Sequence, residues 1–112
     1  MLPLGNGCDA LLFTDLVDVR WLTGFTGSNG WAVLTGADLV LGTDGRYGDR
    51  ARAETASSGA TVIAETSRAR LHERLIGSLR RAARVGFDPT STTHAEWQRL
   101  AADVALEPTD SV

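Results

Sequence analysis

Three regularly spaced glycines mark residues 21–30, which read Trp-Leu-Thr-Gly-Phe-Thr-Gly-Ser-Asn-Gly. Gly24, Gly27 and Gly30 stand among hydroxyl and amide side chains. Such a loop can present backbone N–H groups to a phosphate or a carboxylate, but this spacing matches neither the dinucleotide-binding fingerprint nor the P-loop. The same residues suit a tight turn in which Asn29 and Gly30 adopt left-handed backbone conformations. The pattern therefore favours a turn, with anion binding as the alternative.

A second polar motif, Asp44-Gly45-Arg46-Tyr47, directly follows an apolar run that we expect to be a buried strand. Ligands of open α/β sheets commonly bind at the carboxyl ends of strands, and an arginine there can hold a carboxylate or a peptide carbonyl with its fork of donors. The structural alternative is that Asp44 caps the next helix, Arg46 pairs with a nearby carboxylate and Tyr47 packs in the core. Taken alone, the motif favours this structural alternative.

The remaining reactive side chains indicate neither a catalytic residue nor a metal site. Ser28 lacks the Gly-x-Ser-x-Gly elbow of many hydrolases, and the only histidines, His72 and His94, are both predicted on helices. Asp88 and His94 are the nearest pair of metal-ligand type, but no further ligand follows at helical or turn spacing. We therefore predict no catalytic residue, metal or cofactor in this chain, with His94 exposed on the first turn of a helix.

The composition is that of a soluble globular domain. The chain has 112 residues, of which 43% are apolar and 22% charged, so residues 1–112 can form one domain with a single modest core. The net charge of -3 argues against a nucleic-acid binder. No apolar run approaches the roughly 20 residues that span a bilayer. The single cysteine, Cys8, precludes an internal disulfide and suits a cytoplasmic protein.

Every basic residue of the chain is an arginine. Six of them cluster in its second half, on a predicted helix and the segment that follows it: Arg68, Arg70, Arg74, Arg80, Arg81 and Arg84. A cluster of this kind is usually a solvated helix face. We therefore do not read it as a nucleic-acid site.

Short apolar runs bounded by turn residues predict the strands. They cover residues 10–14, 31–35, 39–43, 61–65, 84–88 and 105–107. Gly36-Ala37-Asp38 separates the second run from the third, so these two runs should form an antiparallel hairpin. Beyond Asp44 strands alternate with helices, which indicates the α/β class with a mixed β-sheet and flanking helices.

Capping residues and apolar stripes predict the helices. A turn of helix is expected at 19–22, with Asp18 as its N-cap and Gly24 as its end. A second helix covers about residues 47–57 and stops at Gly59, and a third begins at Ser67.

Thr93 and Glu96 have the spacing of a capping box, in which each residue binds a backbone N–H of the other. They predict the start of a fourth helix. Its apolar residues, which we expect to be buried, are Trp97, Leu100, Ala101 and Val104.

Taken together, the segments 9–12, 19–30 and 41–47 closely resemble the N-terminal domain of Xaa-Pro peptidases, the creatinase, prolidase and aminopeptidase P family. Their order and the gaps between them match as well as their residues. The likeness extends more weakly through the predicted strand at 84–88, so it covers nearly the whole chain. As a set these motifs are specific, whereas any one alone would not be.

The resemblance implies a ribonuclease-H-like α/β domain that precedes a catalytic pita-bread domain. In such enzymes the catalytic domain holds two divalent metals, often manganese, which activate the water that attacks the bond before proline. That domain and its ligands are expected outside residues 1–112. By position, Arg46 is the best candidate for reaching substrate, with Asp44 and Tyr47 orienting it.

Two hypotheses about function follow from the resemblance. The first is a non-catalytic N-terminal domain of a cytoplasmic Xaa-Pro aminopeptidase or dipeptidase. This domain would support homodimer formation and form one side of the site that binds a proline-containing peptide. The alternative is a free-standing module with a pseudo-peptidase domain that binds peptides or proteins. The gene sequence beyond Val112 distinguishes the two hypotheses. The first requires roughly 200 to 250 further residues that contain the metal ligands, which is the size of another domain.

Overall fold

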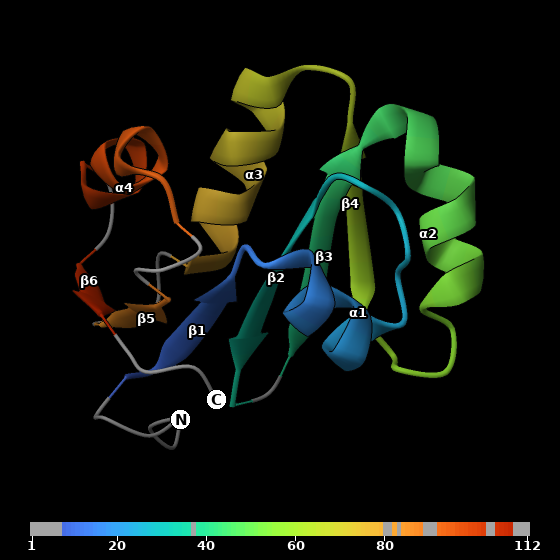
Figure 1. Ribbon diagram of the computed structural model, residues 1–112, viewed down its shortest axis with the longest axis horizontal. Coiled ribbons are helices and arrows are strands. Elements are labelled where there is room, and N and C mark those ends of the chain that lie inside the picture. The colour runs from blue at the N-terminus through green and yellow to red at the C-terminus, as the bar shows by residue number, and fades with distance from the viewer. Residues whose placement is uncertain are drawn as a thin grey trace.

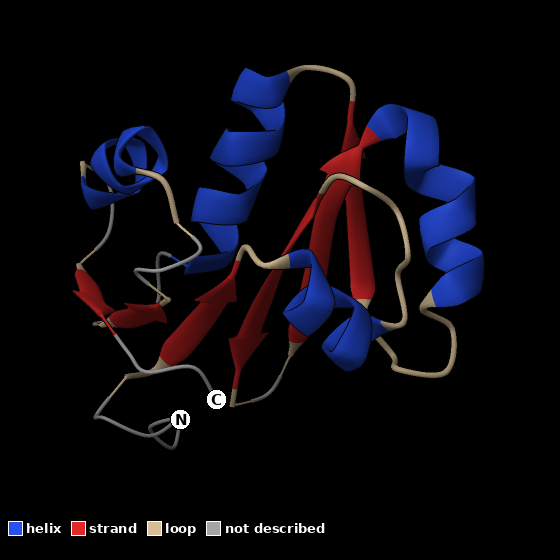
Figure 2. Cartoon of the chain, viewed as in Figure 1, coloured by secondary structure: helices blue, strands red, loops and turns tan. Residues whose placement is uncertain are grey.

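Six strands form one mixed β-sheet in the computed structural model (Figure 1; Figure 2). The structure describes residues 8–36, 38–79, 82, 84–88, 92–102 and 105–108. The spatial order of the strands is β4-β3-β2-β1-β5-β6. Their bounds are β1 (Ala10–Phe13), β2 (Gly30–Thr35), β3 (Leu39–Asp44), β4 (Thr61–Glu65), β5 (Val85–Phe87) and β6 (Leu106–Pro108).

Strand β2 runs antiparallel to both of its neighbours, β1 and β3, whereas the other neighbouring strands are parallel. The register of β2 and β3 pairs Gly30 with Thr43 and Leu34 with Leu39, which confirms the predicted hairpin. Ala37, in its loop, lies outside the described residues. The predicted mixed sheet is therefore confirmed, and its ribonuclease-H-like character stays a prediction.

Helices flank the sheet, and Asp15, Asp44 and Thr93 cap the starts of three helical segments. The helical segments are α1 (Leu16–Thr23), the 3-10 turn η1 (Gly45–Tyr47), α2 (Gly48–Glu54), α3 (Arg68–Leu79) and α4 (His94–Ala101). The capping box of Thr93 and Glu96 is present at the start of α4, and the Ser67 hydroxyl accepts the Arg70 backbone N–H at 3.3 Å. No helix of the described ranges has the length and apolarity needed to cross a membrane.

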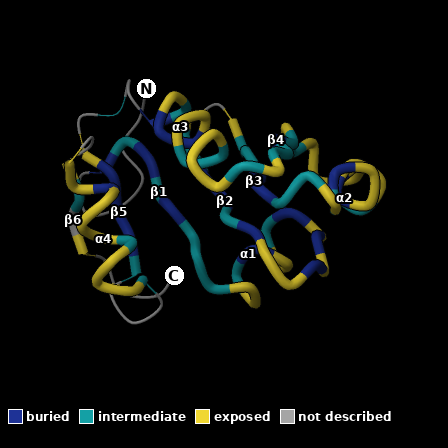
Figure 3. Tube along the Cα trace, turned by 90° about the horizontal axis from the view of Figure 1, so that it is seen from above, coloured by how far each residue is buried: buried dark blue, intermediate teal, exposed yellow. Residues whose placement is uncertain are grey.

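Alternation along the strands divides the buried apolar side chains between the two faces of the sheet. One face packs against α3 and α4 through a cluster that includes Leu12, Val33, Leu75, Leu79 and Leu100. The other packs against α1 and α2 through Val19, Phe25, Ala32, Leu41 and Ala51. Figure 3 shows the strands running between α3 and α1. The sheet is thus covered on both faces.

The predicted cap of the first helix is wrong. The Asp15 side chain, and not that of Asp18, accepts a backbone N–H, from Val17 at 2.8 Å, so α1 begins at Leu16. Gly24 ends this helix as predicted, in a left-handed conformation with φ 86°. The helix is therefore longer than the turn expected at 19–22.

The buried face of the fourth helix is narrower than predicted. Leu100 is buried, but Trp97 is 40% exposed and Ala101 is exposed. The indole of Trp97 instead stacks on the His94 ring, with centroids 6.1 Å apart, and His94 is exposed as predicted. The predictions for Val104, Arg80 and Arg81 fall outside the described residues.

Candidate functional site

The Asp44–Tyr47 motif lies at the carboxyl end of β3, beside the end of the parallel strand β4. Asp44 pairs in register with Glu65, the last residue of β4. The Asp44 carboxylate caps η1 by accepting the Arg46 backbone N–H at 2.9 Å. This cap turns the chain sharply out of the sheet, so Arg46 is presented where two parallel strands end.

The Arg46 side chain is 76% exposed, yet its guanidinium is oriented by two neighbours. Its Nε and Nη2 atoms donate to the Asp44 carboxylate at 3.2 and 3.3 Å, a bidentate contact. The guanidinium carbon also lies 5.9 Å from the Tyr47 ring centroid, within cation–π range. The result is an exposed cation in a defined orientation.

Electrostatics at this motif follow from the same bonds. The Arg46 backbone N–H, and then its guanidinium, hold the pKa of Asp44 below its ordinary value. In return, the hydrogen bond from the Arg46 side chain to Asp44 raises the pKa of Arg46. The pair therefore stays ionised throughout the neutral range.

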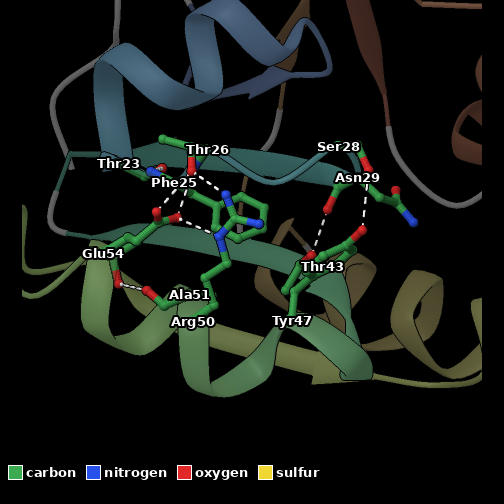
Figure 4. Close-up of polar contacts among 11 residues, drawn as sticks. Thr23, Phe25, Thr26, Ser28, Asn29, Thr43, Tyr47, Arg50, Ala51 and Glu54 are labelled. Carbon is green, nitrogen blue, oxygen red and sulfur yellow. Dashed lines mark hydrogen bonds and ion pairs between the residues drawn. The ribbon is translucent and has the colours of Figure 1, made fainter.

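Tyr47 connects this motif to the glycine-containing loop (Figure 4). Its hydroxyl lies 3.2 Å from the Ser28 hydroxyl oxygen. Its ring meets the buried Phe25 ring edge to face, with centroids 6.1 Å apart and an interplanar angle of 71°. The two motifs, separate in sequence, thus form one surface.

The loop between α1 and β2 is held by a residue that the sequence did not single out. The Glu54 carboxylate of α2 accepts the Thr26 backbone N–H at 2.9 Å and the Thr26 hydroxyl at 2.8 Å (Figure 4). Arg50 donates to the same hydroxyl and pairs with Glu54 at 3.5 Å. These bonds, led by the Thr26 backbone N–H, lower the pKa of Glu54.

The glycine spacing has a steric explanation. A Cβ on Gly24 would lie 2.7 Å from the Glu54 carbonyl oxygen, and one on Gly27 would lie 2.1 Å from the Phe25 Cζ. Gly30, by contrast, is the first residue of β2, and the left-handed glycines of the described residues are Gly24 and Gly59. Gly24 therefore has the left-handed conformation, whereas the prediction of that conformation at Gly30 is wrong.

The structural alternative for the Asp44–Tyr47 motif is observed. Asp44 caps, Arg46 pairs with a carboxylate, and Tyr47 packs partly against Phe25. This arrangement leaves the guanidinium exposed, so it is compatible with substrate contact as well. Within the described ranges, no cluster of three or more His, Cys, Asp or Glu side chains could hold a metal ion, and we derive no chemistry through one.

This fold and these motifs define a domain of the proline-peptidase type, and the sequence comparison identifies the family. Residues 5–112 match the Creatinase/Prolidase N-terminal domain, and the chain belongs to that family. It is 32% identical over 110 residues to the uncharacterized peptidase YqhT of Bacillus subtilis, covering 91% of this chain. The chain spans 29% of that relative's length.

Solved structures agree in fold. The N-terminal domain of the cytoplasmic peptidase PepQ from Mycobacterium tuberculosis superposes with a TM-score of 0.77 at 30% identity, over 93% of this chain and 83% of that one. An X-prolyl aminopeptidase from Caenorhabditis elegans, described as a cytosolic enzyme with a di-nuclear active site, gives 0.73 at 27% identity. That match covers 96% of this chain and 20% of the enzyme.

Proposed function

We propose that this chain is the non-catalytic N-terminal domain of a metal-dependent Xaa-Pro aminopeptidase or dipeptidase. Family membership over residues 5–112 carries the proposal. Support comes also from the relatives, which include a peptidase and an enzyme with a di-nuclear site, and from the lack of a metal-binding cluster among the described side chains. The two metals, manganese by expectation, would belong to a separate catalytic domain that performs the hydrolysis.

The domain's part in the reaction is substrate access, with Arg46 as the contact residue. The guanidinium is exposed and oriented by Asp44 and Tyr47, so it can bind a peptide carbonyl or a carboxylate without first being ordered. We place this surface beside the catalytic domain in a cytoplasmic homodimer. The proline-containing peptide would then lie between the two domains.

The first test uses the chain alone. When the chain is incubated with manganese and a Xaa-Pro peptide, we expect no product. Clear turnover would contradict the proposal. The complementary test uses the polypeptide from the full reading frame, which should hydrolyse the same peptide and lose that activity with chelator. If the frame encodes no metal ligands beyond Val112, the free-standing binding module replaces the peptidase domain as the explanation.

A further inference from the structure

A groove of about 660 Å³ lies on the face of the sheet that carries α3 and α4. Its apolar lining comes from Trp31, Gly42, Ala69 and Leu71, and α4 contributes its other wall. The volume falls within the roughly 300 to 1,000 Å³ typical of ligand sites. The contacts of Tyr47 and Thr26 belong to the opposite face, so this groove is a separate surface that shares only Asp44 with the motif above.

The groove opens where the chain leaves two adjacent parallel strands in opposite directions. After Asp44, β3 continues into α2, whose Ala51 packs on the α1 face. After Glu65, β4 continues into α3, whose Leu75 packs on the other face. In open α/β sheets such a divergence leaves a crevice outside the carboxyl ends of the strands, where ligands bind. The topology therefore favours a ligand site here.

Three carboxylates line the groove, and each already has a partner within the domain. The pairs are Asp44 with the Arg46 side chain at 3.2 Å, Glu65 with Arg74 at 3.0 Å and Glu96 with the Thr93 backbone N–H at 2.9 Å. Their capacity to bind cations is correspondingly reduced, because the nearest arginines or a helix cap already occupy them. The three carboxylates of the groove are therefore already paired within the domain.

Two arginine side chains line the same groove and have no partner among the residues that the structure describes. The side chains of Arg68, on α3, and Arg99, on α4, are exposed and form no hydrogen bond or ion pair with any other described residue. An unpaired guanidinium presents its donor fork to solvent and matches a carboxylate bidentately. Within the described part of the chain, the groove therefore offers two unpaired cations, one from each helical wall, around an apolar surface.

We propose that this groove binds an acidic peptide segment. An apolar side chain of the segment lies on Trp31 and Leu71, and its flanking carboxylates pair with Arg68 and Arg99. A polyanion such as nucleic acid fits poorly, because the chain carries a net charge of -3 and the groove itself holds three carboxylates. A peptide with discrete acidic side chains matches both the charges and the apolar floor.

The test is a titration of the isotope-labelled chain with the blocked peptide acetyl-Glu-Leu-Glu-amide, followed by NMR. Saturable shifts are expected at the Trp31 indole N–H and at the Gly42 and Thr66 backbone amides, which line the groove. The double variant Arg68→Gln/Arg99→Gln should bind about tenfold or more weakly, because two charge-assisted pairs are lost.

The matched control is Arg20→Gln/Arg70→Gln, which removes the same charge from exposed residues outside the groove. It should keep the affinity within about twofold, since neither side chain lines the groove and exposed charges are screened by salt.

Four results would overturn the proposal. They are equal binding of acetyl-Gln-Leu-Gln-amide, an unchanged affinity in Arg68→Gln/Arg99→Gln, inorganic phosphate producing the same shifts at the same concentration, and concentration-dependent shifts of these signals without peptide. The third would reveal a simple anion site, and the fourth would place a second copy of the chain in the groove. None of these readouts depends on peptidase activity, so the result is independent of the function proposed above.

Discussion

The Glu54 carboxylate binds Thr26 twice, through its backbone N–H at 2.9 Å and its hydroxyl at 2.8 Å, although the two residues are 28 positions apart. This contact ties the loop between α1 and β2 to α2. The same loop carries Ser28, which contacts Tyr47 of the candidate site. Because Glu54 binds both the backbone N–H and the hydroxyl of Thr26, it should determine how rigidly this part of the loop is held against α2.

Replacing Glu54 with Gln should loosen this loop. The amide keeps one acceptor oxygen but loses the charge that strengthens both bonds. We expect the Thr26 backbone amide to exchange with solvent faster, on the order of tenfold, while the amides of the β2–β3 ladder keep their protection. Hydrogen exchange measured by NMR checks this, with Glu73→Gln on the exposed face of α3 as the control. Unchanged exchange at Thr26 would contradict the assigned role.

Lowering the pH should break the contact between Glu54 and Thr26. The pKa of Glu54 is lowered below its ordinary 4.5 in the folded chain, led by the Thr26 backbone N–H. Its stabilising contribution is therefore complete above pH 4.5 and is lost as the pH falls through the lowered folded pKa. The Thr26 amide signal should titrate with a midpoint below 4.5 and stop titrating in Glu54→Gln. A midpoint above 4.5 would show that the carboxylate is not stabilised by these bonds.

Local sequence signals predicted the elements but not the contacts between them. The apolar runs gave the strands because burial on both sides of a sheet demands them, and Thr93 with Glu96 fixed the start of α4 because both halves of a capping box lie within one turn. Asp15 and Asp18 are both acceptable caps by residue type, and only the backbone geometry selects Asp15.

The contacts of the candidate site were likewise only partly predictable from the sequence. The Asp44 cap was predictable from its place after a strand, whereas the Glu54–Thr26 contact and the groove at Arg68 and Arg99 join residues distant in sequence. No periodicity or spacing encodes such a contact. The exposure of Trp97 was missed for a related reason, because its stacking on His94 competes with burial.

Gly27 should tolerate no side chain. A Cβ at this position would lie 2.1 Å from the Cζ of Phe25, a ring that is buried in the core. Gly27→Ala should therefore destabilise the domain by about 1 to 3 kcal/mol through overpacking. Gly77→Ala is the control, because nothing lies within 4 Å of its Cβ in α3, and it should stabilise by about 0.5 to 1 kcal/mol. Urea unfolding measures both, and equal effects would argue against the close approach.

Asp15 and Asp18 should respond in opposite ways to neutralisation. Asp15→Ala removes the side chain that accepts the Val17 N–H, at a cost of about 1 kcal/mol. Burial, and then the nearby charges of Asp15 and Asp88, raise the pKa of Asp18, so its charged form is disfavoured in the folded chain. Asp18→Asn should therefore leave stability at pH 7 unchanged or increased. Thermal unfolding of both variants at pH 7 tests this, and a larger loss in Asp18→Asn would restore Asp18 as the cap.

Arg46 should matter for substrate and little for folding. Its side chain is 76% exposed, and its only polar or cation–π partners among the described residues are Asp44 and Tyr47, so Arg46→Gln should shift the Tm of this chain by less than about 2 °C. In the polypeptide that includes the catalytic domain, the same variant should raise KM for a Xaa-Pro peptide by about tenfold with a smaller change in kcat.

Arg46→Lys separates the two possible contributions of this side chain, because it keeps the charge but loses the donor fork that Asp44 orients. We expect it to resemble Arg46→Gln in KM. The matched control is Arg52→Gln, an arginine with a 60% exposed side chain whose Nη1 atom lies 3.5 Å from the Asp49 carboxylate on α2. It should leave KM and Tm unchanged. Should Arg46→Gln lower Tm strongly while KM stays constant, Arg46 would be a structural residue and the substrate contact would have to lie elsewhere.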